Sequence, residues 1–325
     1  MSVSVRACVV IGLLTIARPC FAWGDKGHQL VARIAARSVS STVKRHIVAF
    51  LRKASPDDLS LQALIGKTGD PQPSLANFEA ALAKMAIWPD HMPGGKGITA
   101  PWHFVDIALF EGPSHLAERC GAGGCVSEKI PILAANIKAN KKLVVTLASG
   151  QTLTFTPPQE ARFLLHFLGD IHQPLHSATN ADAGGNCVDV SGFSGSSQLH
   201  SVWDAALVNA AIQGLTNPAK SLIIEFQGEM ASVMTQTNAD ELAGESFGVA
   251  KAEVYAKARP VVVPVIDHFV DLTPSECATK APAVIRALHV DGPGSFNNAA
   301  TLALVRERIF MAGVRLAAIL ENIFQ

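Results

Sequence analysis

The stretch HFLGDIHQPLH, residues 166–176, combines a helical pattern with a dense set of metal-binding side-chain types. Residues 160–171 have the apolar spacing of a helix, so His166 and Asp170, four residues apart, are expected on one face of it. Pro174 ends or kinks that helix, and His176 follows. Imidazole nitrogen and carboxylate oxygen are good zinc ligands, and an i, i+4 pair supplies two of them without straining the backbone.

The same side-chain types recur in four other clusters. His200 and Asp204 in LHSVWD (199–204) repeat the i, i+4 arrangement, and WGDKGH (23–28), WPD (88–90) and WHFVD (102–106) lie upstream. Each cluster alone is weak evidence, because a lone His-x3-Asp is more often a local hydrogen bond and a lone Trp-His-Phe is more often core packing. Together the clusters favour a metal centre over several unrelated structural pairs.

Apolar spacing elsewhere predicts a mainly α protein. The expected helices cover residues 28–51 with a break at the Ser-rich patch 38–42, then 77–85, 160–171, and a long closing helix over 299–324. Residues 142–156 differ, because β-branched residues flank Ser149-Gly150, which predicts a small β-hairpin. The Gly- and Ser-rich residues 184–197 are expected to form a loop. No repeat or interdomain linker is evident, so residues 23–325 are expected to form a single domain.

The amino terminus, residues 1–22, has the layout of a cleavable secretory signal. Arg6 precedes the short apolar run ACVVIGLLTIA (7–17), and Cys20-Phe21-Ala22 places small residues where signal peptidase requires them. A buried first helix is the alternative. The run is too short to span a bilayer, and no other stretch is long enough, so we expect a soluble mature protein without stable membrane association. Cleavage after Ala22 would make Trp23 the first residue of a secreted or periplasmic protein.

Four cysteines remain after residue 22. Cys120 and Cys125 bracket Gly-Ala-Gly-Gly, a loop flexible enough to close, which predicts a disulfide between them. A pair between Cys187 and Cys277 follows only by elimination, since sequence cannot show that their Cα atoms approach. A cysteine metal site is the competing interpretation, but no CxxC pair supports it. Disulfides favour an oxidising compartment.

The charge balance excludes a protein that holds nucleic acid mainly through Lys and Arg. The chain has 27 Lys plus Arg and 27 Asp plus Glu. Loss of Arg6 and Arg18 with the signal leaves 25 against 27, a formal charge of −2. A protein that neutralised phosphates with basic side chains would be clearly basic. Charge that binds phosphate must therefore come from elsewhere, and bound metal is the obvious source.

The order of the motifs resembles the S1/P1 family of trinuclear zinc nucleases. That order is WGxxxH, WPD, HFxD, HFLGDxHQPLH, GGN and LHxxWD, and the likeness resumes at AGVRLA (312–317), so it spans nearly the whole mature chain. The family includes fungal single-strand-preferring nucleases, plant bifunctional nucleases and 3′-nucleotidases, with bacterial phospholipase C as a distant relative. The resemblance implies a helical domain of the phospholipase C and zinc nuclease type, with its metals at the bottom of a cleft.

Carried over residue by residue, the resemblance implies three zinc ions per chain. The first would be held by Asp90, His103, His166 and Asp170. The second would be held by His28, Asp170 and the α-amino nitrogen and carbonyl oxygen of Trp23, so that Asp170 bridges the two ions. The third would be held by His176, His200 and Asp204.

The resemblance also implies hydrolysis by a metal-activated hydroxide, with 5′-phosphate products. Three Zn²⁺, three aspartates and one hydroxide leave about +2 in the cleft. Asp170 and Asp106 are the catalytic candidates. Asp106 would orient water or contact a base, or else support His103. Phe104 would stack a base or simply pack the core, and Asn186 would hydrogen-bond substrate or serve a turn.

Three functions remain open at this point. The first is a monomeric endonuclease that cuts single-stranded DNA and RNA and also removes 3′-phosphates from nucleotides. The second is a phospholipase C-like enzyme that uses the same metals on a lipid phosphodiester. The third is an exported zinc-binding protein without catalysis, which would give no reason for an open coordination position, whereas hydrolysis requires one.

Overall fold

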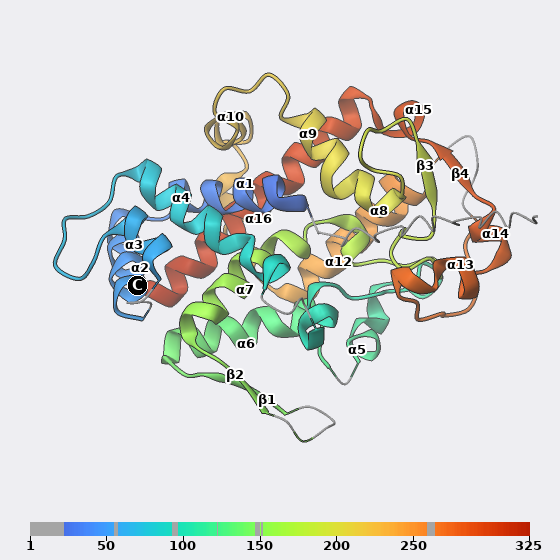
Figure 1. The fold of residues 1–325 in the computed structure, drawn as a ribbon. Helices are drawn as coiled ribbons and strands as arrows, with labels where there is room; N and C mark the ends of the chain where they lie inside the picture. Colours follow the sequence, from blue (N-terminus) through green and yellow to red (C-terminus); the bar gives the residue numbers. More distant parts are fainter. Residues whose placement is uncertain are drawn as a thin grey trace, which may run out of the picture.

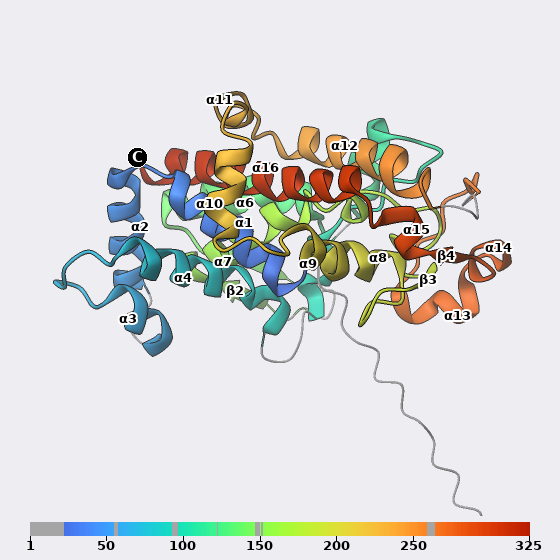
Figure 2. The ribbon, with the colours of Figure 1, turned by 90° about the horizontal axis from the view of Figure 1, so that it is seen from above.

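Three long helices form the centre of the protein: α1 (Gly24–Ser38), α7 (Pro157–Asp170) and α16 (Ala299–Phe324). Helices α1 and α16 pack against each other, and α7 contacts both (Figures 1 and 2). The computed structural model describes residues 23–54, 58–92, 97–121, 123–146, 150, 152–258 and 264–325. The mainly α class and the closing helix over 299–324 are confirmed. The signal interpretation of residues 1–22 falls outside the described residues.

Gly313 allows α1 and α16 to approach closely. A Cβ atom at this position would lie 2.5 Å from Cβ of Ile34 and 2.9 Å from the carbonyl oxygen of Val31. Only glycine fits so near another backbone, which accounts for the glycine inside AGVRLA. The contact fixes α1, and with it His28, against the centre of the protein.

Helices α4 (Leu75–Ala86) and α6 (Val126–Ala139) flank α7, and α4 also packs on α1. The predicted break after residue 38 is present, because α1 ends at Ser38 and α2 begins at Ser41. The other helices are α2 (Ser41–Ala54), α3 (Leu59–Ile65), α5 (Leu116–Arg119), α8 (Leu199–Ser201), α9 (Leu207–Ala211), α10 (Pro218–Glu225), α11 (Met230–Val233), α12 (Ala239–Val249), α13 (Cys277–Lys280), α14 (Ala283–Arg286) and α15 (Gly292–Phe296). The 3-10 and π-helical turns are η1 (Trp88–His91), η2 (Gly97–His103), η3 (Pro113–His115), η4 (Pro174–His176), η5 (Val202–Ala206), η6 (Ala250–Tyr255) and η7 (Pro274–Glu276).

The predicted hairpin is present. Strand β1 (Leu143–Thr146) pairs antiparallel with β2 (Thr152–Phe155), with Leu143 opposite Phe155, and it projects from the helical body (Figure 1). The loop predicted over 184–197 was wrong in part, since it contains β3 (Asp189–Ser191), parallel to β4 (His289–Asp291). A three-residue strand whose partner lies a hundred positions away leaves no local pattern in the sequence.

Both expected disulfides form. Cys120 is bonded to Cys125, and Cys187 is bonded to Cys277 across 90 positions of the chain. The second bond ties the segment that follows GGN to the start of α13. None of the helices in the described part of the chain is long and apolar enough to cross a membrane.

Candidate metal centre

Helix α7 carries the first two predicted ligands on one buried face. Thr156 and Gln159 form a capping box at its start, Pro157 occupies its first turn, and the helix ends at Asp170. His166 and Asp170 have no exposed surface. Nε2 of His166 lies 3.4 Å from Oδ2 of Asp170, as the i, i+4 spacing predicts.

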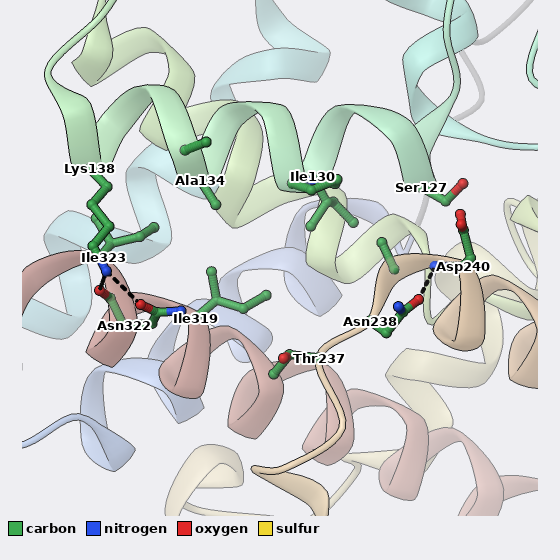
Figure 3. A pocket seen from close by; sticks show the side chains of 13 residues that line it. Ser127, Ile130, Ala134, Lys138, Thr237, Asn238, Asp240, Ile319, Asn322 and Ile323 are labelled. Carbon is green, nitrogen blue, oxygen red and sulfur yellow. Dashed lines mark hydrogen bonds between the residues drawn. The ribbon is translucent and has the colours of Figure 1, made fainter.

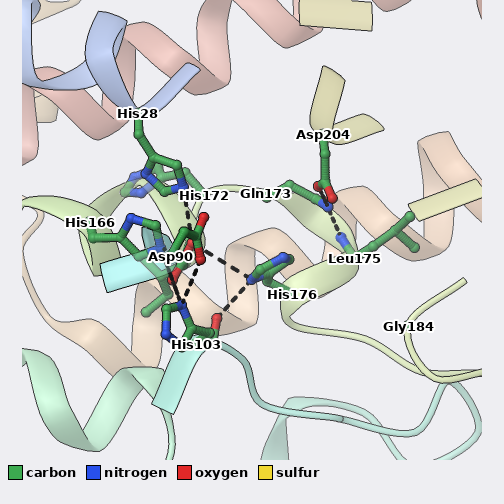
Figure 4. Close-up of polar contacts among 12 residues, drawn as sticks. His28, Asp90, His103, His166, His172, Gln173, Leu175, His176, Gly184 and Asp204 are labelled. Atoms are coloured by element: carbon green, nitrogen blue, oxygen red, sulfur yellow. Dashed lines mark hydrogen bonds and ion pairs between the residues drawn. The ribbon is translucent and has the colours of Figure 1, made fainter. Parts of the chain in front are cut away.

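Two short 3-10 turns bring Asp90 and His103 to these residues. Turn η1 carries Asp90 and η2 carries His103. Nδ1 of His103 lies 3.0 Å from Oδ2 of Asp170 and 3.2 Å from Nε2 of His166. Nε2 of His166 lies 3.5 Å from Oδ1 of Asp90. All four side chains therefore meet at one point, although they come from three separate segments (Figure 4).

His28 reaches the same point from α1. Its Nε2 lies 3.4 Å from Oδ1 of Asp170, and its ring stacks on that of His166 with centroids 3.8 Å apart. A Cβ atom at Gly169 would lie 2.6 Å from Nδ1 of His28, so the glycine of HFLGD makes room for this ring. Within the described residues, both ring nitrogens of His28 and Oδ1 of Asp170 are buried without a hydrogen-bond partner.

A third group lies beyond the end of α7. His176 comes from η4, His200 from α8, and Asp204 from the π-helical turn η5. The Nε2 atoms of the two histidines are 3.0 Å apart, and Nε2 of His200 lies 3.4 Å from Oδ2 of Asp204. Single π-helical turns inside longer helices are frequent at functional sites.

Backbone carbonyls fix the tautomers of three histidines. Nδ1 of His166 bonds the carbonyl oxygen of Ala86, Nδ1 of His176 bonds that of His103, and Nδ1 of His200 bonds that of Gly184, each at 2.7 Å. A carbonyl oxygen can only accept, so each Nδ1 must carry the proton. In its neutral form, each ring then presents the lone pair of Nε2 to its cluster, which is the form that binds metal.

The geometry fits zinc. Two ligand atoms about 2.1 Å from a tetrahedral zinc ion lie about 3.4 Å from each other. Three groups of His and Asp atoms in the described residues meet within 4.8 Å: His28, His166 and Asp170; Asp90, His103 and His166; His176, His200 and Asp204. All eight predicted histidine and aspartate ligands belong to these groups.

The ionisation states also suit metal binding. Burial opposes the charge on Asp170, but His166 and His103 outweigh it and hold the pKa of that carboxyl well below its ordinary value. Burial, together with His166, lowers the pKa of His28. Ionised aspartate and neutral histidine are the forms that coordinate zinc.

Trp23 is wholly buried at the start of α1. Its carbonyl oxygen accepts a hydrogen bond of 3.0 Å from the amide of Gly27. A Cβ atom at Gly24 would lie 3.3 Å from the carbonyl oxygen of Asp204, so the chain at residues 23–24 passes beside the third group. Residue 24, which follows the predicted amino-terminal ligand, therefore lies close to the backbone of Asp204.

The predicted substrate residues belong to none of the three groups. Phe104 and Asp106 are half-buried directly after His103, and Asn186 is buried with its Nδ2 donating to the carbonyl of Ala183 at 2.7 Å. Burial, reinforced by Asp271 and Asp182, raises the pKa of Asp106 to about 8. The bond from Asn186 is the one expected of a turn residue.

Gln173 is a residue that the sequence analysis overlooked. It is fully buried, its Nε2 donates to Oδ1 of Asp204 at 2.7 Å, and its Oε1 accepts from the amide of Leu175 at 2.6 Å. It thereby orients the carboxylate of Asp204. Its position inside the stretch 166–176, where most other polar residues are ligands, was the available signal.

His172 lies behind the metal centre and links it to α16. It is fully buried. Its Nδ1 donates to the carbonyl of Leu168 at 2.7 Å, and its Nε2 accepts from Nη1 of Arg315 at 2.9 Å. Arg308 donates to its carbonyl at 3.2 Å, and both arginines pair with Glu245. Arg315, the arginine of AGVRLA, therefore stabilises the position of the residues that follow Asp170.

A separate pocket of about 460 Å³ lies between α6, α16 and the start of α12 (Figure 3). Ile130, Lys138, Asp240 and Ile323 are among its lining residues, and none of the eight predicted ligands lines it. Its polar groups are partly used within the protein, since Lys138 donates to the carbonyl and side chain of Asn322. The three groups of histidine and aspartate lie outside this pocket.

Comparison with known proteins identifies the family of the chain. The S1/P1 Nuclease family matches residues 23–325. Endonuclease 3 of Arabidopsis thaliana is 26% identical over 320 residues, which is 97% of this chain and 93% of that protein. Endonuclease 2 of the same plant is 25% identical over 219 residues, 66% of each chain, and Nuclease S1 of Aspergillus oryzae (strain ATCC 42149 / RIB 40) is 27% identical over 208 residues, 62% of this chain and 60% of that protein.

Proposed function

The chain belongs to the S1/P1 nuclease family and is a nuclease acting on phosphodiester bonds, and from this premise we propose that it is an exported endonuclease for single-stranded DNA and RNA. It would carry three zinc ions, leave 5′-phosphate ends and also act as a 3′-nucleotidase. Zinc dependence is typical of the family, and the histidine and aspartate clusters supply the donors.

One observation carries the proposal: three groups of buried donors with the spacing of zinc ligands. Asp90, His103, His166 and Asp170 would hold one ion; His28, Asp170 and Trp23 a second; His176, His200 and Asp204 a third. Asp170 directs one oxygen toward each of the first two proposed sites. Its Oδ2 lies 3.0 Å from Nδ1 of His103, and its Oδ1 lies 3.4 Å from Nε2 of His28. A carboxylate placed in this way would suit a bridge between two ions.

When bound, the ions supply positive charge that polarises a phosphoryl oxygen and lowers the pKa of a water molecule near neutrality. The chain contributes position and charge. Asp170 keeps both of its oxygens directed into the paired sites, and Gln173 holds the carboxylate of Asp204. No serine or cysteine nucleophile is needed for such hydrolysis.

The substrate would be held beside the third group. Val105 donates from its amide to the carbonyl of His176 at 2.8 Å, so Phe104 and Asp106 are tied next to that group. The half-buried ring of Phe104 suits stacking on an unpaired base, which any base in a single strand can provide. Asp106 would contact a base or orient water, and Asn186 would contact substrate from the opposite turn.

Export would complete the site. Cleavage after Ala22 would free the amine of Trp23, and the family match begins at this residue. Trp23 is buried at the start of α1, the helix that carries His28, which supports its part in the second site. Two disulfides are typical of the oxidising compartments outside the cytoplasm.

The test uses the mature protein, Trp23 to Gln325, loaded with zinc. Its substrates are a single-stranded DNA, the same DNA as a duplex, an RNA, a 3′-mononucleotide and a phosphatidylcholine analogue. We expect cleavage of single-stranded DNA and RNA to exceed cleavage of the duplex, with 5′-phosphates on the products. Hydrolysis of the lipid alone, or zinc binding without any hydrolysis, would contradict the proposal.

A matched pair of variants controls this test. His200→Ala removes a proposed ligand, whereas His268→Ala changes an exposed histidine that pairs with its neighbour Asp267. Activity should fall by about 10³-fold or more in the first and stay unchanged in the second. Equal activity of the two variants would show that His200 has no role in hydrolysis.

A further inference from the structure

The turn at residues 181–185 is held in an unfavourable conformation beside the third group. Ala181, Ala183, Gly184 and Gly185 have φ of 56°, 53°, 59° and 83°. The left-handed region suits glycine but is disfavoured for alanine, because Cβ approaches the following carbonyl oxygen. Two left-handed alanines in one turn persist only where the surroundings enforce them.

Hydrogen bonds to Asp182 hold the turn in this conformation. Its Oδ1 accepts hydrogen bonds from the amides of Asn180 and Gly185 and from the hydroxyl of Tyr255, each at 3.0 Å. Its own carbonyl accepts from the amide of Cys187 at 3.0 Å. The side chain has no exposed surface. One carboxylate thus joins both ends of the turn and anchors them to η6.

The turn places a backbone carbonyl oxygen next to a predicted zinc ligand, His200. The oxygen of Gly184 accepts from Nδ1 of His200 at 2.7 Å, and the amide of His200 donates to the oxygen of Gly185 at 3.3 Å. A Cβ atom at Gly184 would lie 2.7 Å from the carbonyl oxygen of Leu175, so this position requires glycine for space as well as for φ. The orientation of the His200 ring therefore depends on the shape of the turn.

We propose that Asp182, anchored by Tyr255, is a positioning residue for zinc at the third site, because it shapes the turn whose Gly184 carbonyl orients His200. The inference rests on the proposed function, since it assumes that His176, His200 and Asp204 hold zinc. Asp182 acts through His200, and it belongs to none of the ligand groups found in the described residues.

The proposed role depends on one acceptor atom of Asp182, Oδ1, which receives the hydrogen bonds from Asn180, Gly185 and Tyr255. An asparagine at 182 can still accept from the two backbone amides, whereas an alanine cannot. The two substitutions therefore separate turn geometry from electrostatics.

The experiment measures zinc binding to the mature protein against a competing chromophoric chelator. Wild type should bind three zinc ions and His200→Ala two. Asp182→Ala should bind the third ion at least about 10-fold more weakly, because the Gly184 carbonyl that orients His200 would be displaced, and loss of such a partner of a metal ligand typically lowers affinity 10- to 100-fold. Asp182→Asn should stay within about threefold of wild type, and Tyr255→Phe should fall between the two variants of Asp182.

Two further variants keep the test decisive if Asp182→Ala folds poorly. Ala183→Gly removes a strained left-handed alanine and should restore part of the third-site affinity when combined with Tyr255→Phe. Asp58→Asn is the matched control, because Asp58 likewise accepts from two backbone amides, those of Ser60 and Leu61, and pairs with Arg162. It should leave zinc binding unchanged.

The outcomes distinguish the two claims. A wild type that saturates below three zinc ions would overturn the proposed function and this inference with it. If wild type binds three zinc ions, and Asp182→Ala and Tyr255→Phe bind zinc as tightly as wild type does, only the proposed role of Asp182 is overturned.

Discussion

His176 and His200 face each other through Nε2 atoms 3.0 Å apart, while their Nδ1 atoms donate to the carbonyls of His103 and Gly184. With each Nδ1 proton donated to a backbone oxygen, the neutral form of each ring directs the lone pair of its Nε2 toward the other ring. Such a pair of facing nitrogens would suit a cation bound between them. The carboxylate of Asp204, 3.4 Å from Nε2 of His200, completes a set of donors that suits a divalent ion.

Asp170→Asn should abolish hydrolysis. An amide offers one neutral oxygen in place of two charged ones, so it cannot bridge the paired sites. We expect activity to fall by about 10³-fold or more, equivalent to about 4 kcal/mol of activation free energy. Asp267→Asn, at an exposed carboxylate, is the control. The bridging role is wrong if Asp170→Asn retains near-normal turnover of single-stranded DNA.

An extra residue before Trp23 should lower both the zinc content and the activity of the mature enzyme. A peptide nitrogen is a poor ligand compared with a free amine, so an added residue would remove the proposed amine ligand of Trp23. We expect one zinc ion fewer per chain and at least about tenfold lower activity. The same residue added after Gln325 serves as the control. Three zinc ions and full activity in the amino-terminal extension would show that the amine is not a ligand.

Removal of zinc by EDTA should lower thermal stability. The proposed ligands come from five segments of the chain, so ions that bind only the folded state stabilise it. At a free zinc concentration 1,000-fold above the Kd, each site contributes about 4 kcal/mol. We expect the melting temperature to fall by at least about 5 °C and to recover when zinc is restored. An unchanged melting temperature would contradict convergence of these segments on metal.

The two disulfides should differ in their contributions to stability. Cys187–Cys277 closes a loop of 90 positions and Cys120–Cys125 one of five. Loop-closure entropy predicts a loss of about 4 to 5 kcal/mol for the first and about 2 kcal/mol for the second. Serine replacement of each pair, followed by chemical denaturation of the zinc-loaded protein, measures both. Equal losses would show that loop length does not set their contributions.

The sequence predicted the elements that have strong local signals. The helices that carry His28, His166 and Asp170 follow from apolar periodicity, and the i, i+4 pairs at 166–170 and 200–204 lie as their spacing requires. The hairpin was visible because β-branched residues flank its turn. Grouping of the eight ligands rested on motif order, since no local rule brings Asp90 or His28 to α7.

The supporting residues were harder to predict, because their partners are distant in sequence. Asp182 meets Tyr255 across 73 positions, and His172 meets Arg315 across 143. The strand pair β3 and β4 is equally non-local. Hydrogen bonds of this kind depend on how whole elements pack, which periodicity and spacing do not encode.

Anomalous diffraction from crystals of the mature protein, recorded at the zinc absorption edge, tests the trinuclear centre most directly. Three peaks are expected: two that flank Asp170, and one between His176, His200 and Asp204. Peaks elsewhere on the surface, or no peak at these clusters in protein grown with zinc, would contradict the account.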